Sequence, residues 1–400
     1  MQTLHQSPTD PAFVQNPYPF YRRARAAGPL VFWADYAMPA ATSHAAVNAI
    51  LRDRRFGREE PEDRRTPVPD RLAAFYAVEA HSMLELEPPR HTRLRGLVLR
   101  AFTARRIAAL EPEIAALAHA LIDALPDGGP IDLLPAFAQR IPVIIIARLL
   151  GVPETMADQL LTWSNAMVGM YQARRTRQME DAAAAAARDF AAFLRGYAEA
   201  RRSRPADDLI THLIAAEEDG ARLTTDEMIA TCILLLNAGH EATVHSLGNG
   251  IKTLLETQTP PDALAPARIA ATVEEILRFD PPLHLFTRWA YAEAEIAGHR
   301  FAAGDRVALL LAAANRDPQV WHRPDRFDPA RPDKPHAAFG AGLHFCVGAP
   351  LARLELQTAL PILFARLPGL ALAGKPRYAD LYHFHGLAAL PVTPGPPARP

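Results

Sequence analysis

The chain has 400 residues, of which 49% are hydrophobic and 22% are charged, so it has enough apolar material for a large core. Its formal net charge of -1 gives no overall attraction to nucleic acid or to an anionic membrane. Two cysteines in a chain of this length argue against a disulfide framework and predict a reducing, cytoplasmic location.

The N-terminal part predicts a short α/β segment followed by a loop. No basic segment followed by an apolar run opens the chain, so no signal peptide is expected. Residues 16–20 predict a loop before a short helix, and residues 28–53 predict two strands and a helix. Residues 57–82 are polar, contain prolines and lack periodicity, which predicts a mobile loop with an apolar island at Phe75 and Tyr76.

A helical pattern begins at His91 and continues to about residue 218. His91 and Arg95 lie one helical turn apart, which suits a shared anion, although solvated charge on a helix face explains the pair equally well. The apolar segment 141–152 contains Arg148 and is too short to span a membrane. The helical ranges expected are 91–103, 104–125, 141–152, 155–202 (more than one helix) and 207–218, the last ended by Gly220.

The longest helix is expected to begin near Thr224, which forms a capping-box pattern with Glu227, and to end near Thr257. Its first half is apolar on every face, which predicts a helix buried in the protein and makes Cys232 a core residue. Gly239 lies beside polar residues within this helix. It is either a packing glycine or the site of a local bulge.

The C-terminal third predicts a helix that ends near Phe279, strands such as residues 306–313, a further helix and a hairpin-like tail. Glu275 and Arg278 are three residues apart and face the same side of the first helix. Taken alone, they are a routine surface ion pair. The sequence contains no internal repeat and no Rossmann glycine fingerprint.

The glycine-rich loop 339–348 (FGAGLHFCVG) contains Cys346 and leads into a helix with Pro350 in its first turn. The dipole and free N–H groups at a helix N-terminus favour a thiolate, the form of cysteine that binds metal. A buried structural cysteine is the plain alternative, and a catalytic nucleophile is another. Zinc is disfavoured because no second cysteine or histidine stands at zinc-ligand spacing.

This loop resembles, position for position, the haem-binding loop of the cytochrome P450 monooxygenases; the matching residues are Phe339, Gly340, Gly342, His344, Cys346 and Gly348. The resemblance covers nearly the whole chain. It implies one mainly α domain over residues 1–400 with a small β part, and a long central helix over haem b (iron protoporphyrin IX). It also makes Cys346 the axial thiolate, and thiolate ligation favours O–O cleavage.

The same resemblance assigns roles to residues outside the loop. His91, Arg95, Arg288 and His344 are expected to contact the haem propionates, whose two negative charges need cationic partners when buried. Glu275 and Arg278 match the buried Glu-x-x-Arg pair of the family, and Arg326 is the best candidate for the basic residue that joins the pair.

The middle of the long helix matches the oxygen groove of the family, with Gly239 at the kink and Glu241 as the acid that delivers protons. The usual alcohol after the acid is replaced by Ala242. Thr243 lies about 100° further round the helix and is not a simple substitute. A substrate hydroxyl or an ordered water near His240 or His245 completes the relay, or oxygen activation is poorly coupled.

The resemblance predicts insertion of one oxygen atom from dioxygen into a C–H bond of a lipophilic small molecule. Electrons are expected from a ferredoxin and its reductase, with Arg105, Arg106 and Arg353 on the docking surface. A soluble monomer that binds neither membrane nor nucleic acid is expected, with a lid near residues 163–171. The alternatives are a hydrogen-peroxide-driven peroxygenase and a non-catalytic haem sensor. The expected pocket residues are Phe75, Tyr76, Leu235, Leu283, Phe286 and Leu387.

Overall fold

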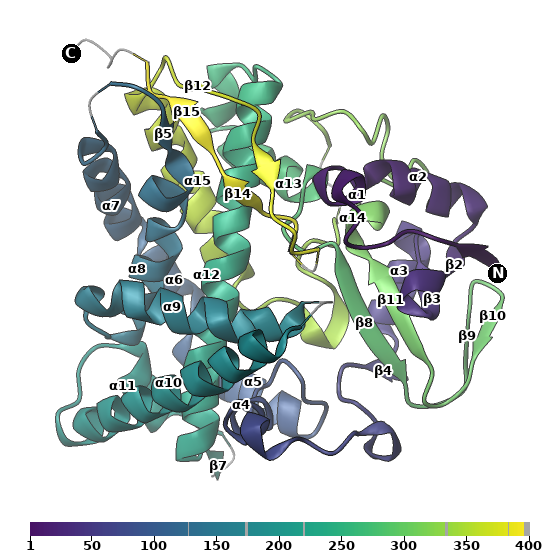
Figure 1. Ribbon diagram of the computed structural model, residues 1–400. Helices are drawn as coiled ribbons and strands as arrows, with labels where there is room; N and C mark the ends of the chain where they lie inside the picture. The colour runs from purple at the N-terminus through teal and green to yellow at the C-terminus, as the bar shows by residue number, and fades with distance from the viewer. Residues whose placement is uncertain (127, 173–174, 219–220, 333–334, 383, 396–400) are drawn as a thin grey trace. The chain divides into compact units, whose positions relative to one another are not determined.

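The computed structural model describes residues 1–400 except 127, 173–174, 219–220, 333–334, 383 and 396–400, and it is mainly helical with a smaller β part (Figure 1). Contacts between residues divide the chain into two units. Unit 1 comprises residues 1–57, 114–140 and 242–400, and unit 2 comprises residues 58–113 and 141–241. The division falls inside helix α12 (Thr225–Glu256), after Glu241.

A six-stranded sheet in unit 1 has the spatial order β1-β2-β3-β11-β8-β4. Its strands are β1 (Gln2–Leu4), β2 (Leu30–Trp33), β3 (Met38–Ala41), β4 (Phe56–Gly57), β8 (Leu285–Ala290) and β11 (Arg306–Leu310). β1 pairs with β2 in parallel, as β3 does with β11, and the other pairs are antiparallel. Phe286 and Arg288 are two residues apart on β8, so they share one face of the sheet.

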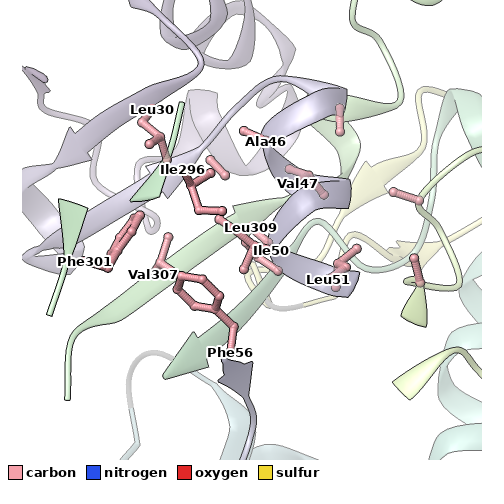
Figure 2. Close-up of a cluster of buried hydrophobic side chains, with 14 of the residues drawn as sticks. Leu30, Ala46, Val47, Ile50, Leu51, Phe56, Ile296, Phe301, Val307 and Leu309 are labelled. Atoms are coloured by element: carbon pink, nitrogen blue, oxygen red, sulfur yellow. The ribbon is translucent and has the colours of Figure 1, made fainter. Parts of the chain in front are cut away.

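Helix α3 (His44–Arg52) packs its apolar face on this sheet. The Ser43 side chain caps the helix by accepting a backbone hydrogen bond at 3.2 Å. Figure 2 shows Val47 and Ile50 of α3 among the strand residues, with Leu309 of β11 beside Ile50. Full burial of such a side chain contributes about 1.5–3 kcal/mol, so this cluster fixes α3 on the sheet.

Smaller sheets complete the β part. In unit 1, β9 pairs with β10, β13 pairs with β14, and β12, β15 and β5 form a three-stranded sheet. Unit 2 contains the pair β6–β7. These strands are β5 (Ile131–Asp132), β6 (Glu217–Glu218), β7 (Ala221–Arg222), β9 (Ala294–Ile296), β10 (His299–Phe301), β12 (Ala371–Leu372), β13 (Arg377–Tyr378), β14 (Leu387–Ala389) and β15 (Pro391–Thr393).

The remaining helices are distributed over both units. Those wholly in unit 1 are α1 (Pro11–Gln15), α2 (Tyr18–Ala27), α13 (Ile269–Phe279), α14 (Leu311–Ala314) and α15 (Ala349–Arg366). Those wholly in unit 2 are α4 (Ala73–Glu79), α5 (Arg90–Ala101), α6 (Ala104–Ala108), α9 (Ala157–Val168), α10 (Arg177–Ser203) and α11 (Leu209–Ala215). α7 (Glu111–Asp123) and α8 (Arg140–Leu150) begin near a division.

The expected mainly α class with a small β part is confirmed, as is the position of the longest helix. Its capping box forms as predicted: the Thr224 N–H donates to Glu227 at 2.9 Å, and the Glu227 N–H donates to the Thr224 hydroxyl at 3.2 Å. Gly239 does not interrupt the α-helical assignment of α12. Among the described residues, no helix is both long and apolar enough to cross a membrane.

One expectation about secondary structure is wrong. Residues 57–82 were expected to be a loop, but they contain α4, whose Phe75 and Val78 are buried. The two-turn helix is too short for its apolar period to be recognised in the sequence. Arg71, two residues before α4, forms ion pairs with Glu180 and Asp181 of α10, and these fix α4 beside α10. The expected hairpin-like C-terminal tail is present, because β13 pairs antiparallel with β14, and β12 pairs antiparallel with β15, which also pairs with β5. Gly220, expected to end a helix, lies outside the described residues.

Candidate active site

Cys346 lies at the end of the loop before α15, as the sequence predicts. Its backbone N–H donates to the Phe339 carbonyl oxygen at 3.1 Å, which closes the loop. Gly348 is the N-cap residue of α15, and a Cβ atom on it would lie 3.8 Å from the Cys346 sulfur. The half-buried thiol is therefore beside a helix N-terminus, where a thiolate is stabilised.

The glycine at position 342 is required by the backbone of this loop. Gly342 has a φ of +68°, and a Cβ atom there would lie 2.3 Å from the Leu51 carbonyl oxygen. No other residue adopts this conformation at so close an approach without strain. The loop therefore packs closely against the end of α3 at this position.

The surroundings of Cys346 fit a flat apolar group such as a porphyrin. Leu343 and Phe345 precede Cys346 in the loop, and each is 39% exposed. The Phe339 ring is half-buried and lies 6.3 Å from the Phe345 ring. An exposed apolar surface in the same loop as a thiol at a helix N-terminus is compatible with thiolate ligation of haem.

Arg353, expected on a docking surface, is engaged by its own unit. Its guanidinium donates to Glu274 at 2.6 and 2.8 Å and lies 4.6 Å from the centroid of the Phe339 ring. Burial opposes ionisation of Glu274, but hydrogen bonds from Arg353 and His336 outweigh it and lower the pKa of Glu274 to about 2. This ion pair joins the start of α15 to α13.

Glu275 and Arg278 form a buried bidentate ion pair, with distances of 2.6 and 2.8 Å. The predicted third member is wrong: Arg331 donates to both Glu275 oxygens at 3.2 Å, whereas Arg326 contributes only its carbonyl oxygen. The Asp328 N–H also donates to Glu275, so the part of the loop that contacts the Glu275–Arg278 ion pair lies after residue 326. Several arginines in this segment match the motif equally well, and the sequence alone does not select Arg331.

The residues expected at the propionates belong to different units. Arg288 (2% exposed) donates to the Thr287 carbonyl at 2.8 Å, and His344 lies within the glycine loop of unit 1. His91 (1% exposed) and Arg95 (half-buried) lie one turn apart on α5 in unit 2. Buried cationic side chains of this kind suit an anionic ligand.

One stripe of α12 is accessible although the helix is otherwise largely buried. Ala238 is exposed and Glu241 is half-buried, and the two share a face. A Cβ atom on Gly239 would meet only the Ile146 side chain at 4.0 Å, so packing does not demand a glycine there. Ala242 is half-buried, whereas Thr243 is 3% exposed and does not share this accessibility.

Glu241 has a titratable neighbour on the same helix. The Nδ1 atom of His240 lies 3.5 Å from a Glu241 carboxylate oxygen, and the exposed fractions of the two side chains are 2% and 12%. A carboxylate and an imidazole this close together can hold and pass a proton.

The residues expected to line the substrate pocket differ in exposure. Phe75, Leu235 and Leu387 are buried, at 3%, 8% and 2% exposed. Tyr76, Leu283 and Phe286 are half-buried, and the last two pack against the cluster of Figure 2. In the expected lid, Trp163 stacks on Phe190 of α10 at 5.1 Å.

Sequence reasoning missed a contact at the end of α4. The Tyr171 hydroxyl donates to Glu79 at 3.0 Å, which joins the expected lid to the expected pocket helix within unit 2. Burial, and then repulsion from Glu85, raise the pKa of Glu79 to about 7. A carboxyl group with this pKa near neutral pH has no local sequence signature, because the groups that shift it come together only in the fold.

This pKa predicts a pH-dependent stability. Glu79 keeps its proton in the folded state up to about pH 7, whereas the unfolded chain releases it near pH 4.5. The contribution of Glu79 to stability is therefore greatest below about pH 4.5, and about 3 kcal/mol of it is lost as the pH rises from about 4.5 through about 7. Unfolding by urea at several pH values should show this loss in the wild type and not in Glu79→Gln. Glu199→Gln, at an exposed position on α10, is the matched control and should keep the loss.

Comparisons with known proteins agree with this geometry. The family model for Cytochrome P450 matches residues 269–367. Vitamin D(3) 25-hydroxylase of Pseudonocardia autotrophica is 39% identical over 397 residues, covering 96% of this chain and 95% of that protein. The cytochrome P450 monooxygenase PikC of Streptomyces venezuelae is 37% identical, covering 95% and 91%. The crystal structure of P450BioI with an acyl carrier protein carrying hexadec-9Z-enoic acid has a TM-score of 0.89, 34% identity and coverage of 96% and 99%.

Proposed function

Since the chain belongs to the cytochrome P450 family, and is therefore a haem b monooxygenase with the cytochrome P450 fold, we propose that it hydroxylates a lipophilic small molecule with electrons from a ferredoxin and its reductase. The observation that carries the proposal is the position of Cys346 directly before the N-terminus of α15, in a glycine loop that also exposes Leu343 and Phe345.

The family resemblance indicates the residues that would hold haem b. Cys346 would supply the thiolate ligand, and Phe339 and Gly348 would form the wall of the loop beside it. A thiolate-ligated haem supplies O–O cleavage when it is bound. The cationic side chains that bind and orient its propionates are His91, Arg95, Arg288 and His344.

Glu241 holds the proton for the reaction. The accessible stripe of α12 supports this role, because it carries Glu241 beside the small residues Ala238 and Gly239. Ala242 provides no hydroxyl group, so a substrate hydroxyl or a water held between Glu241 and His240 passes the proton onward. His240 Nδ1, 3.5 Å from the Glu241 carboxylate, could anchor such a water beside the carboxylate.

Ala242→Thr tests this relay. The variant restores a hydroxyl next to Glu241, so the fraction of reductant that appears as product should rise, most clearly for substrates without a hydroxyl group. Product formed per NAD(P)H consumed is the measurement. Thr243→Val, which removes a hydroxyl at similar volume, should leave this ratio unchanged. An unchanged ratio in Ala242→Thr would show that no relay is missing at this position.

A lipophilic substrate is supported by the expected pocket, whose residues are aromatic or aliphatic, and by the names of the relatives. One relative is named as a hydroxylase of vitamin D(3), and a similar structure holds a fatty acyl chain on its carrier protein. Both ligands are long and apolar, so we place the substrate of this chain in the same chemical class.

External electrons are required because the chain has too few cysteines for an iron–sulfur cluster held by four thiolates. Arg353 and Arg106 already contact Glu274 and Asp207, respectively, so their charges are partly compensated. Arg105 is exposed on α6 and remains the best candidate among the three for contact with an acidic partner.

A haem spin-state titration against lipophilic compounds, each paired with its hydroxylated analogue, tests the proposed substrate class. A saturable shift to high spin, followed by product formation with ferredoxin and reductase, is the expected result. Binding without product would favour a sensor, and product formed only with hydrogen peroxide would favour a peroxygenase, the alternative that Ala242 supports.

A further inference from the structure

A second cluster of potential metal ligands lies in unit 1 and uses none of the residues assigned to haem. It comprises Asp280, His284 and His385, which are 5%, 0% and 4% exposed. Asp280 ends α13, His284 directly precedes β8, and His385 precedes β14. More than 100 residues separate His385 from the other two in sequence, so only the fold brings the three together.

The backbone fixes the segments that carry these side chains. The His385 N–H donates to the Pro282 carbonyl at 2.7 Å, and the Leu311 N–H donates to the His284 carbonyl at 2.9 Å. The Asn249 side chain of α12 donates to the carbonyl oxygens of His385 and Asp280 at 2.8 and 3.3 Å. The cluster therefore stands on rigid elements, as a metal site requires.

The distances suit a tetrahedral metal ion. One ligand atom from each residue lies within 4.8 Å of the other two, and His385 Nε2 is 3.5 Å from Asp280 Oδ1. Zinc bonds of about 2.1 Å place neighbouring ligands roughly 3.4 Å apart. The atom pair of His385 and Asp280 is thus already at the separation of zinc ligands. The distances from the His284 ligand atom to the other two ligand atoms need to shorten by at most about 1.4 Å.

Neighbouring tyrosine side chains hold the potential ligand side chains in place through hydrogen bonds. Tyr21 Oη lies 2.9 Å from His284 Nδ1, while Tyr18 and Tyr378 donate to the two oxygens of Asp280 at 2.7 and 2.5 Å. The Tyr378 ring also stacks on His385 at 3.7 Å. Such outer contacts fix the ring orientation of ligating histidines and hold ligating carboxylates.

His284 supplies an independent sign of a missing partner. Its Nδ1 atom is engaged by Tyr21, and its Nε2 atom is buried without a hydrogen-bond partner among the described residues. Leaving such a nitrogen unsatisfied costs about 1–3 kcal/mol.

We propose that Asp280, His284 and His385 bind one zinc ion that ties the end of α13 to the strands β8 and β14. Asp280 offsets part of the zinc charge. The nearby Arg316 guanidinium directs two N–H groups to the Phe279 carbonyl at 3.0 and 2.6 Å and does not compete for Asp280. The site is structural and does not rest on the proposed hydroxylation.

The test is the zinc content of the purified holoenzyme after incubation with Zn²⁺ and desalting. We expect about one zinc per chain in the wild type and less than about one-tenth in His284→Asn, with haem content unchanged. Asparagine keeps a polar atom near the Nδ1 position and removes Nε2, so the Tyr21 contact survives. His322→Ala, at an exposed position in the same unit, should bind zinc like the wild type.

X-ray absorption at the zinc edge identifies the ligands without a variant. Nitrogen and oxygen at about 2.0–2.1 Å are expected, whereas sulfur at about 2.3 Å would mean that Cys346 or Cys232 holds the metal. Added zinc should also raise the thermal midpoint of the wild type but not that of His284→Asn. A wild type that binds no stoichiometric zinc, a sulfur shell, or full zinc binding by His284→Asn would overturn the proposal.

Discussion

Replacement of Cys346 by serine is expected to lower turnover by about 10³-fold or more, which corresponds to at least about 4 kcal/mol of activation free energy. A serine hydroxyl is not ionised at neutral pH and does not push electron density toward iron as a thiolate does. The carbon-monoxide difference spectrum of the reduced protein should lose the band typical of thiolate ligation, and this readout does not depend on knowing the substrate.

Cys232→Ser is the matched control, because the chain has only these two cysteines. Cys232 is 1% exposed on α12, and burial raises the pKa of its thiol to about 12, so it stays neutral. This variant should keep the thiolate spectrum at some cost in stability. A thiolate spectrum that survives in Cys346→Ser and vanishes in Cys232→Ser would contradict the assignment.

Arg278→Ala is expected to lower the free energy of unfolding by about 3–5 kcal/mol, because it leaves the Glu275 carboxylate buried without its bidentate partner. Three carbonyl oxygens, of Asn315, Pro324 and Arg326, also lose the Arg278 guanidinium as donor. Urea unfolding of the haem-loaded protein, together with the haem content after expression, measures the effect.

Two further variants test which arginine joins the pair. Arg331→Ala should also destabilise the protein, since this side chain contacts both Glu275 oxygens. Arg326→Ala should change the free energy of unfolding by less than about 0.5 kcal/mol, because its exposed side chain makes no contact with Glu275. The reverse order of the two effects would restore the prediction made from sequence.

The sequence predicts the elements that are set by local chemistry. The capping box of Thr224 and Glu227, the alanine-rich α10 and the proline at the start of α15 each define a helix within a few residues. The loop before α15 was predicted as well, because its glycines indicate a backbone conformation that other residues avoid. Gly342 adopts such a conformation where it approaches the Leu51 carbonyl oxygen.

Features that depend on long-range packing could not be predicted. α4 is held by α10, about 100 residues away in sequence, and Arg331 reaches Glu275 only because of the path of its loop. The cluster of Asp280, His284 and His385 has no ligand spacing in the sequence, since β14 joins it from the C-terminal end of the chain. In each case, the tertiary fold and not the local sequence determines which residues come into contact.

Turnover under isotopically labelled dioxygen, with ferredoxin, its reductase and a compound that shifts the spin state, tests the central claim most directly. We predict a hydroxylated product that carries one labelled oxygen atom and is absent without the reductase. An unlabelled product, or product formed only when hydrogen peroxide is supplied, would contradict a dioxygen-dependent monooxygenase.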